Sequence, residues 1–533
     1  MPTFTIDEQR IEAQPGETIL QAARRAGVEI PTLCYLEGFE AGASCMVCAV
    51  KNLANGQFIP ACGSRVVDGM KVEHATAEVR ETRKMALELL FSDHLGDCLS
   101  PCQRICPANL GIPAMLKQLR AGEFGLAAAS ARRDLALAGI LCRICHRPCE
   151  HGCRRSDEDE AVAIGDLVTH AIETEIAAGP PRPPWSPSPQ AAKVAIIGAG
   201  FTGLSTAWFL ASRGYACVVV DGRETPESAI RAEFPDVPEA VLQAEIGLLE
   251  RAGAVFRMGV RITGSADLDA LLEETGAVVL ATGVSGSGMA AALGLNAAGN
   301  TIAVDKESMM TSRPGVFAGG RLLRPKAQPV GRVADGKALA HCVDQYLTGD
   351  RVRRPHKPFS VFMGRLVDGE MTDFMQQVSR APRSEAGDMA VDLERAIEES
   401  HRCVHCNCAK ADVCKLRQLA VDHGVDMHRF SSGERLRFKR DIGHPLVCFE
   451  PGKCIRCGNC IKVAGDHSEA LGLTFIGRGF DVHLGVPFSD TLADGLLEAA
   501  RAAVDACPTG ALTLREPKPA GGCGCGGAGG CGG

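Results

Sequence analysis

The residues of this chain that are best suited to chemistry are its cysteines, of which there are 25 among 533 residues. They fall into short-spaced groups, separated by long stretches that contain almost none. The N-terminal segment is acidic and lacks the basic region and apolar run of a secretory signal, so we expect a cytoplasmic protein. Disulfides are disfavoured in the cytoplasm, where clustered thiols more often bind metal. The cysteine pattern therefore predicts inorganic redox chemistry.

The first group has the spacing C-x10-C-x2-C-x13-C, and its expected metal ligands are Cys34, Cys45, Cys48 and Cys62. Four thiolates from one long loop and one returning strand suit a [2Fe–2S] cluster, whereas structural zinc prefers two compact C-x2-C pairs. The segments IPTLCY, GASCMVCAV and PACGSRVVDGMKV resemble a particular [2Fe–2S] ferredoxin domain. That domain begins the large iron–sulfur subunit of respiratory complex I and the iron-only hydrogenases.

The second group contains seven cysteines and one histidine, which is the number of ligands that two [4Fe–4S] clusters require. The expected ligands are His94, Cys98, Cys102, Cys106, Cys142, Cys145, Cys149 and Cys153. The segments CPANLGIPAMLKQLRAGEFGLAAA and GILCRICHRPCEHGCRR resemble the N-terminal domain of the glutamate synthase small subunit and its relatives. The resemblance implies two [4Fe–4S] clusters in a helical domain.

His94 departs from the pattern of that family, because it stands where a cysteine is expected. Its H-x3-C spacing to Cys98 is similar to that of the His-ligated cluster of the complex I subunit. A lone histidine is more often structural or exposed, so both interpretations of His94 stay open. The division of this group between the two clusters is also open.

A third group has the compact spacing C-x2-C-x-C-x5-C. Four thiolates so close together bind either zinc or a [4Fe–4S] cluster, and the neighbouring cluster motifs favour the second. The expected ligands are Cys403, Cys406, Cys408 and Cys414.

The last group begins a ferredoxin motif, C-x2-C-x2-C, but has Ala464 at the expected fourth position and an isolated C-P pair further on. In two-cluster ferredoxins the fourth cysteine of each motif binds the other cluster, so the loss of one cluster leaves this set of four. The expected ligands of the remaining [4Fe–4S] cluster are Cys454, Cys457, Cys460 and Cys507. Between them, RGFDVHLGVPF resembles the corresponding segment of formate dehydrogenases and iron-only hydrogenases.

The other cysteines have no clear metal-binding pattern. Cys217 and Cys342 lie in apolar patterns and are expected to be buried, inert thiols. Cys448 is ambiguous, and the last three cysteines lie in a glycine-rich tail that we expect to be flexible.

A G-x-G-x-x-G motif lies between an expected strand, KVAIIGAG, and an expected helix, FTGLSTAWFLASRG. Its first glycine permits a tight turn, its second lets the backbone approach a pyrophosphate, and its third allows close packing of helix on strand. Asp221 ends the next expected strand, where an acid can bind a ribose hydroxyl. The middle third of the chain is therefore expected to be α/β and to bind a dinucleotide.

The segments ATG, TIAVDKESMMTSRPGVFAGG and VADGKALA resemble the FAD-binding half of the glutamate synthase small-subunit group. The alternative is a Rossmann domain that has lost its cofactor. The resemblance implies an FAD site formed by Gly198, Gly200, Phe201, Thr202, Gly203, Asp221, Arg223, Ala281, Thr282, Gly283, Gly319, Gly320, Arg321, Val333 and Ala334.

This domain departs from that family in two ways. In the relatives a second Rossmann domain, which binds NADPH, is inserted after the ATG strand. Here 17 residues separate Gly283 from Thr301, too few for a βαβ unit. We therefore expect residues 283–289 to form a loop and the nicotinamide site to be missing. Arg321 stands where the relatives usually carry Asp, which either adds a phosphate contact or marks weaker flavin binding.

These groups predict a multidomain α+β and α/β protein. The net charge of −7 argues against nucleic-acid binding, and no apolar run is long enough to span a membrane. The expected domains are a β-grasp [2Fe–2S] ferredoxin domain (1–78), a helical domain with two [4Fe–4S] clusters (79–178), a linker (179–192), a Rossmann-like FAD domain (193–349), a connector with a four-cysteine [4Fe–4S] motif (350–440), a ferredoxin-like domain with one [4Fe–4S] cluster (441–516) and a flexible Gly/Cys tail (517–533).

The expected function is electron transfer by one [2Fe–2S] cluster, four [4Fe–4S] clusters and one FAD, with no catalytic side chain. The resemblances imply a cytoplasmic hetero-oligomeric complex. In it this subunit relays electrons between a catalytic partner, like a formate dehydrogenase or hydrogenase, and another redox carrier such as a ferredoxin. One alternative is a self-contained NAD(P)H-dependent reductase like the glutamate synthase small subunit. The other is a non-enzymatic iron–sulfur scaffold.

Overall fold

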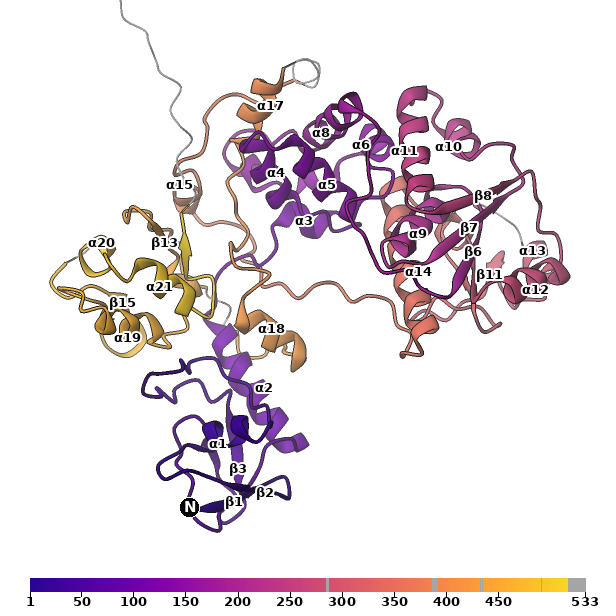
Figure 1. Cartoon of the computed structure of the whole chain (residues 1–533). Helices are drawn as coiled ribbons and strands as arrows, with labels where there is room; N and C mark the ends of the chain where they lie inside the picture. Colours follow the sequence, from indigo (N-terminus) through magenta and orange to yellow (C-terminus); the bar gives the residue numbers. More distant parts are fainter. Residues whose placement is uncertain (284–286, 386–391, 432, 434, 490, 516–533) are drawn as a thin grey trace, which may run out of the picture. The chain divides into compact units, whose positions relative to one another are not determined.

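The computed structural model describes residues 1–283, 287–385, 392–431, 433, 435–489 and 491–515 (Figure 1). The chain forms two compact units, and each unit is made of separate stretches of sequence. The first unit contains Met1–Leu99, Phe359–Gln377 and Cys406–Gly533, and the second contains Ser100–Pro358 and Val378–His405. The connector expected over 350–440 thus contributes to both units, and the tail expected over 517–533 lies outside the described residues.

A five-stranded mixed sheet with the strand order β2-β1-β5-β3-β4 begins the first unit. The pair β1–β5 is parallel and the other three pairs are antiparallel. Helix α1 starts at a capping box, in which Thr18 Oγ1 accepts from Gln21 N at 3.3 Å and Gln21 Oε1 accepts from Thr18 N at 2.9 Å. The elements are β1 (Thr3–Ile6), β2 (Gln9–Glu12), α1 (Ile19–Arg25), β3 (Ala49–Asn52), β4 (Phe58–Pro60) and β5 (Lys71–Glu73).

The rest of the first unit is built from short helices and two antiparallel strand pairs, β13–β16 and β14–β15. Helices α19 and α21 pack together over an apolar core that includes Val463, Leu496 and Val504. The elements are α2 (Ala77–Ser92), α15 (Glu370–Phe374), α18 (Lys415–Asp422), β13 (Val447–Phe449), η3 (Pro451–Lys453), α19 (Asn459–Asp466), β14 (Thr474–Ile476), η4 (Gly479–Asp481), β15 (His483–Gly485), α20 (Leu492–Gly495), α21 (Ala500–Ala506) and β16 (Leu512–Leu514).

The helical domain expected over 79–178 is divided: residues up to Leu99 belong to the first unit, and the second unit begins with a group of helices. Helices α4, α5, α6 and α8 pack together (Figure 1). They bury Leu116, Leu119, Ile140, Leu167 and Ile172 among them. The elements are α3 (Pro101–Ile105), α4 (Ile112–Arg120), α5 (Phe124–Asp134), α6 (Ala138–Ile144), α7 (Pro148–His151), η1 (Arg154–Asp157), α8 (Ile164–Ala178) and, from later in the chain, α17 (Leu393–Ser400).

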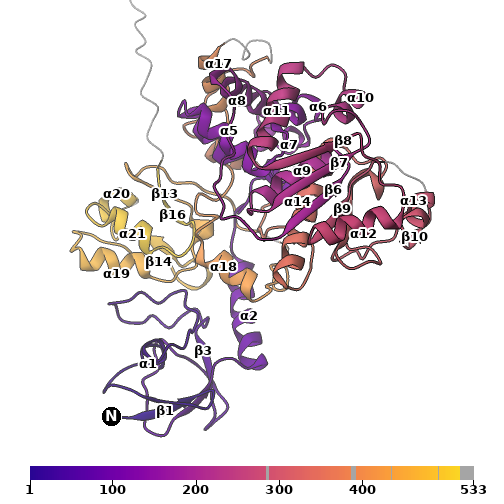
Figure 2. The same ribbon diagram turned by 45° about the vertical axis from the view of Figure 1, so that its right-hand side comes forward.

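A five-stranded parallel sheet with the order β12-β9-β6-β7-β8 completes the second unit (Figure 2). Its middle strand β6 is buried on both faces: Val194 and Ile196 join the core with α9 and α14, and Ala195 and Ile197 join the core with α12. The elements are β6 (Lys193–Ile197), α9 (Phe201–Ala211), β7 (Ala216–Asp221), α10 (Ser228–Glu233), α11 (Glu239–Arg251), β8 (Ala254–Met258), α12 (Ser265–Glu274), β9 (Ala277–Leu280), α13 (Ser287–Ala292), β10 (Ala297–Ala298), β11 (Thr301–Ile302), β12 (Val316–Ala318), η2 (Gly320–Leu322) and α14 (Pro329–Thr348).

The loop expected over 283–289 is only partly a loop. Residues 284–286 lie outside the described residues, and Ser287 already begins helix α13. A small hairpin, β10–β11, follows. The mixed and parallel sheets confirm the expected fold class. Across the described residues, no helix combines the length and the apolar character that crossing a membrane requires.

Candidate cofactor sites

The four cysteines of the first group are buried together in the first unit. Contacts with Cys45 and Cys62 hold the pKa of the Cys34 thiol below its ordinary value, and contact with Cys62 lowers the pKa of Cys48 to about 7. The same contacts raise the pKa of Cys45 and of Cys62 above the ordinary value, so the four thiols lie within reach of one another, as the ligands of a single [2Fe–2S] cluster must. Helix α2 holds the strand that follows Cys48, because buried Arg83 donates through Nε and Nη2 to the Ala49 carbonyl at 3.1 and 2.8 Å.

In the second unit, four of the seven cysteines of the second group line one apolar cavity. They are Cys106, Cys142, Cys145 and Cys149. Leu141, Ile164 and Val168 form part of the wall, and the backbone N–H of Arg147 donates to Cys145 Sγ at 3.4 Å. These four thiols therefore suit one [4Fe–4S] cluster. Val330, in the first turn of α14, also lines the cavity, so the cluster site borders the flavin-type domain.

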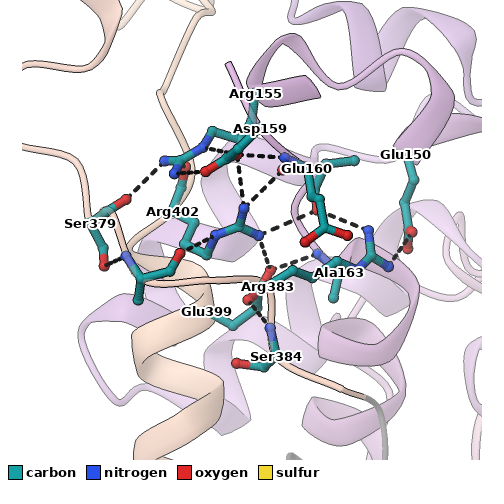
Figure 3. Close-up of polar contacts among 12 residues, drawn as sticks. Glu150, Arg155, Asp159, Glu160, Ala163, Ser379, Arg383, Ser384, Glu399 and Arg402 are labelled. Carbon is teal, nitrogen blue, oxygen red and sulfur yellow. Dashed lines mark hydrogen bonds and ion pairs between the residues drawn. The ribbon is translucent and has the colours of Figure 1, made fainter. Parts of the chain in front are cut away.

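Cys102 and Cys153 pack against the same apolar core of the second unit, and so does Cys403 from the third group. The segment that carries Cys403 is fixed there by a network of charged groups (Figure 3). Arg155, two residues after Cys153, donates through Nη1 to the carbonyl of Arg402 at 3.2 Å and to that of Ser379 at 2.8 Å.

Arg402 is the second arginine of this network (Figure 3). Its guanidinium lies 3.0 Å from Asp159 and 3.1 Å from Glu399. Glu399 is fully buried and also accepts from the backbone N–H of Ala163 at 2.9 Å and of Ser384 at 2.8 Å. Cys403 is thus anchored in the second unit, whereas Cys406, Cys408 and Cys414 belong to the first.

The four cysteines of the last group line one pocket in the first unit. They are Cys454, Cys457, Cys460 and Cys507. Phe449, Leu484 and Leu512 contribute to its wall. Burial raises the pKa of Cys457 to about 12, as expected for a thiol in apolar surroundings. This arrangement suits the single [4Fe–4S] cluster that the spacing predicts.

Cys98, Cys408 and Cys414 lie close together in the first unit although they come from different sequence groups. Cys98 and Cys414 belong to one apolar cluster, and the backbone N–H of Cys408 donates to the Asp97 carbonyl at 2.7 Å. Burial, with the neighbouring thiols Cys408 and Cys98, raises the pKa of Cys414 to about 11. His94 is half-buried, and burial lowers its pKa to about 4.

The expected flavin site lies where β6, α9 and β7 meet. Gly198 has a φ of +115°, and a Cβ at Gly203 would overlap the Gly198 carbonyl oxygen, so the turn requires both glycines. A Cβ at Gly200 would meet nothing within 4 Å, and no side chain caps the N-terminus of α9. Open space beside uncapped backbone N–H groups suits the pyrophosphate of FAD.

Other expected flavin residues line the same edge of the sheet. Asp221 accepts from the backbone N–H of Ala199 at 2.8 Å and from that of Arg223 at 2.9 Å, so it holds the glycine loop closed. Gly320 has a φ of +71° and packs against Thr202. The other expected residues are placed at the ends of β9 and β12 (Ala281, Thr282, Gly283 and Gly319) and at the start of α9 and α14 (Phe201, Val333 and Ala334).

Arg321 forms an ion pair with Glu233 at 3.3 Å, and its Nε donates to the Pro325 carbonyl at 3.2 Å. Glu233 also binds Arg332 through two hydrogen bonds of 2.6 and 2.7 Å, and these contacts hold its pKa below its ordinary value. Arg321 is therefore paired with the carboxylate of Glu233, at the end of α10.

Sequence spacing missed the arginines that hold the cysteine segments in place, Arg83, Arg155 and Arg402. Their only signal is their nearness to cysteines, which does not distinguish a buried arginine from an exposed one. Cys217 and Cys342 are buried, as expected. Within the residues that the structure covers, no group of three or more His, Cys, Asp or Glu side chains is placed to hold a single metal ion.

Three protein-family models match the chain. Residues 1–77 match the 2Fe-2S iron-sulfur cluster binding domain. Residues 94–179 match the model described as dihydropyrimidine dehydrogenase domain II, 4Fe-4S cluster. Residues 156–332 match the pyridine nucleotide-disulphide oxidoreductase model.

Similar curated proteins match only part of the chain. The NADP(+)-dependent formate dehydrogenase subunit beta of Moorella thermoacetica is 34% identical over 35% of this chain and 30% of its own length. An NADH-quinone oxidoreductase subunit of Rhizobium meliloti is 43% identical over 18% of this chain and 12% of its own. The NADP-reducing hydrogenase subunit HndD of Solidesulfovibrio fructosivorans is 34% identical over 28% of each chain. The chain thus spans less than a third of the length of these relatives.

Among solved structures, an NAD+-reducing [NiFe]-hydrogenase in the H2-reduced state is 13% identical, with a TM-score of 0.36, over 98% of this chain and 91% of that one. No conclusion rests on so low a likeness. The matched domains confirm the expected resemblances. In order along the chain, the matched models are thus a 2Fe-2S iron-sulfur cluster binding domain, a 4Fe-4S cluster domain and a pyridine nucleotide-disulphide oxidoreductase domain.

Proposed function

We propose that the chain is a FAD- and iron–sulfur-containing electron-transfer subunit of a cytoplasmic oxidoreductase complex. It holds one [2Fe–2S] cluster, four [4Fe–4S] clusters and one FAD, and it relays electrons between a catalytic partner of the formate dehydrogenase or hydrogenase kind and another redox carrier. Bound FAD exchanges electrons as a pair or singly, so it links a two-electron partner to one-electron clusters. The protein sets cluster spacing and potential through burial and hydrogen bonds.

The observation that carries this proposal is that the cysteine sets adjoin one another. In the first unit, Cys34 and Cys45 belong to an apolar cluster against which Cys457 packs, so the [2Fe–2S] set and the last [4Fe–4S] set are neighbours. In the second unit, Val330 of the flavin-type domain lines the cavity of the Cys106 set. Adjacent redox sites are what an electron relay needs, and the formate dehydrogenase and hydrogenase subunits among the relatives support such partners.

A second candidate is a self-contained NAD(P)H-dependent reductase. The matched pyridine nucleotide oxidoreductase domain favours it, and so does the relative from Geobacter sulfurreducens named NADPH-Fe(3+) oxidoreductase subunit beta, 33% identical over 34% of this chain and 28% of its own length. Against it, the stretch between Gly283 and Thr301 is too short for a second nucleotide-binding βαβ unit, which needs roughly 30 residues. We therefore propose that the chain has no NAD(P)H site of its own.

An anoxic titration of the purified protein separates these candidates. We expect dithionite to bleach the flavin and both NADH and NADPH to leave it oxidised, with about 18 iron atoms per FAD for the proposed cofactor set. Rapid bleaching by either nucleotide would identify a nicotinamide-dependent reductase instead. Purified protein that contains iron but no flavin would favour a scaffold.

A further inference from the structure

Three cysteines that the sequence assigns to two different motifs lie together in the first unit. Cys98, Cys408 and Cys414 are 7, 7 and 6% exposed. Cys98 and Cys414 share an apolar cluster with Leu87 of α2 and Leu416 of α18. A buried cysteine behaves as a small apolar side chain, so burial alone does not indicate a ligand. The meeting of three thiols from separate segments of the chain does, because the ligands of an iron–sulfur cluster must converge on one place.

Backbone pairing brings Cys408 to Cys98. Asp97 and Asn407 form a parallel bridge, and the N–H of Cys408 lies 2.7 Å from the Asp97 carbonyl and 3.4 Å from that of Cys98. The Cys408 thiol faces Gly510, where a Cβ would overlap Sγ. Gly510 thus leaves room for this sulfur beside the loop that follows Cys507.

Packing of two helices places Cys414 beside the same segment. Cys414 precedes α18, and α18 packs on α2, the helix that leads to His94. Fully buried Glu88 of α2 accepts from the Asp426 N–H at 3.1 Å and pairs with Arg429 at 2.8 Å. The segment that follows α18 is thereby held against α2.

His94 offers a fourth donor, four residues before Cys98. Its Nδ1 is buried and has no hydrogen-bond partner among the residues that the structure describes. The side chain of Lys453 lies beside the same segments: a Cβ at Gly96 would come within 2.6 Å of Lys453 Cε, and one at Gly510 within 3.7 Å of Lys453 Cδ. Lys453 is itself buried and paired with Glu450. A buried cation beside three thiolates would offset part of the cluster's negative charge.

Cys403, by contrast, is held in the second unit by the Arg155–Arg402 network (Figure 3). We propose that Cys98, Cys408 and Cys414, with His94 as the fourth ligand, bind one [4Fe–4S] cluster in the first unit. This inference rests on the proposed function, because it takes the thiol sets to be cluster ligands. It replaces the grouping of Cys403, Cys406, Cys408 and Cys414 that the compact motif suggests, and it places a third cluster around the apolar group that already joins Cys34, Cys45 and Cys457.

Iron counting in double variants tests the grouping. If Cys98 and Cys408 share a cluster, the C98S, C408S and C98S/C408S proteins each lose about four iron atoms. If they belong to separate clusters, as the sequence motifs suggest, the double variant loses about eight and the proposal is overturned. C98S/C454S is the matched comparison, and it must lose about eight because Cys454 lines a different pocket. C217S, at a buried thiol far from any cysteine motif, must lose none.

The H94C variant tests His94. It keeps four ligands, so the test does not require a protein that lacks a ligand to fold. We expect unchanged iron content, together with a changed electron paramagnetic resonance spectrum and a lower potential for one [4Fe–4S] cluster, because a thiolate replaces a neutral imidazole. An unchanged spectrum and potential would remove His94 from the ligand set. C403S must leave this cluster's signal in place. Unsubstituted protein without iron would instead overturn the proposed function as a whole.

Discussion

At the scale of single residues, buried charges hold the cysteine-bearing segments of the second unit. Replacing Arg402 with Met leaves Glu399 buried without its guanidinium partner, and we expect the free energy of unfolding of this unit to fall by about 3 kcal/mol. The two tryptophans of the chain, Trp185 and Trp208, both lie in the second unit with ring centroids 4.2 Å apart. Their fluorescence during denaturant unfolding therefore reports on this unit alone.

Arg380 provides the matched control. Its side chain is 72% exposed and lies 3.4 Å from Glu158, a surface pair whose loss costs roughly 0–1 kcal/mol. R380M should therefore unfold almost like the unsubstituted protein. If R380M and R402M lower the free energy of unfolding equally, the burial of Glu399 is not the reason why the network stabilises this unit.

At the scale of elements, the turn between β6 and α9 decides whether flavin binds. A Cβ at Gly203 would overlap the Gly198 carbonyl oxygen and push α9 away from β6. We expect the flavin content of G203A to fall roughly fivefold or more, because the uncapped N–H groups of α9 would no longer face the pyrophosphate. The flavin absorbance of the purified protein, relative to its protein content, measures this loss.

Gly125 in α5 is the control for this substitution, because it is also a helical glycine but a Cβ there would meet nothing within 4 Å. G125A should keep its flavin and gain up to about 1 kcal/mol in stability from the better helix propensity of alanine. Loss of flavin in both variants would mean that flavin binding responds to general destabilisation and not to the turn.

Local patterns predicted most of the elements, because their causes are local. The short apolar run before Gly198 and the glycine spacing at Gly198–Gly203 located β6 and α9. The start of α13 at Ser287 was missed, because the glycines around it indicated a loop. The neighbourhood of Cys98 and Cys408 was also missed, since spacing along a chain carries no information about pairing between distant segments.

At the scale of the whole molecule, we expect cofactor binding and folding to be coupled, because each cluster would join cysteines from separate stretches of the chain, such as Cys106 with Cys142 and Cys460 with Cys507. Removal of iron by anoxic chelation should lower the melting temperature of both units, on the order of 10 °C, and reconstitution should restore it. Hydrogen exchange resolved by peptide would check this, with the largest increases in exchange expected at the segments that carry Cys45, Cys149 and Cys457. Identical exchange with and without iron would show that the folds do not depend on the clusters.

The discontinuity of the first unit has a consequence for how the protein is made. The hydrogen bond between Asp426 and Glu88 joins residues 338 positions apart. At 5–20 residues per second a ribosome needs roughly 20–70 seconds to make that stretch. During this time α2 and Cys98 have left the ribosome, while the segments that will cover them do not yet exist. These thiols must therefore stay reduced and protected from aggregation until synthesis is almost complete. We expect expression in cells with ample chaperones and little oxygen to give the highest yield of intact protein.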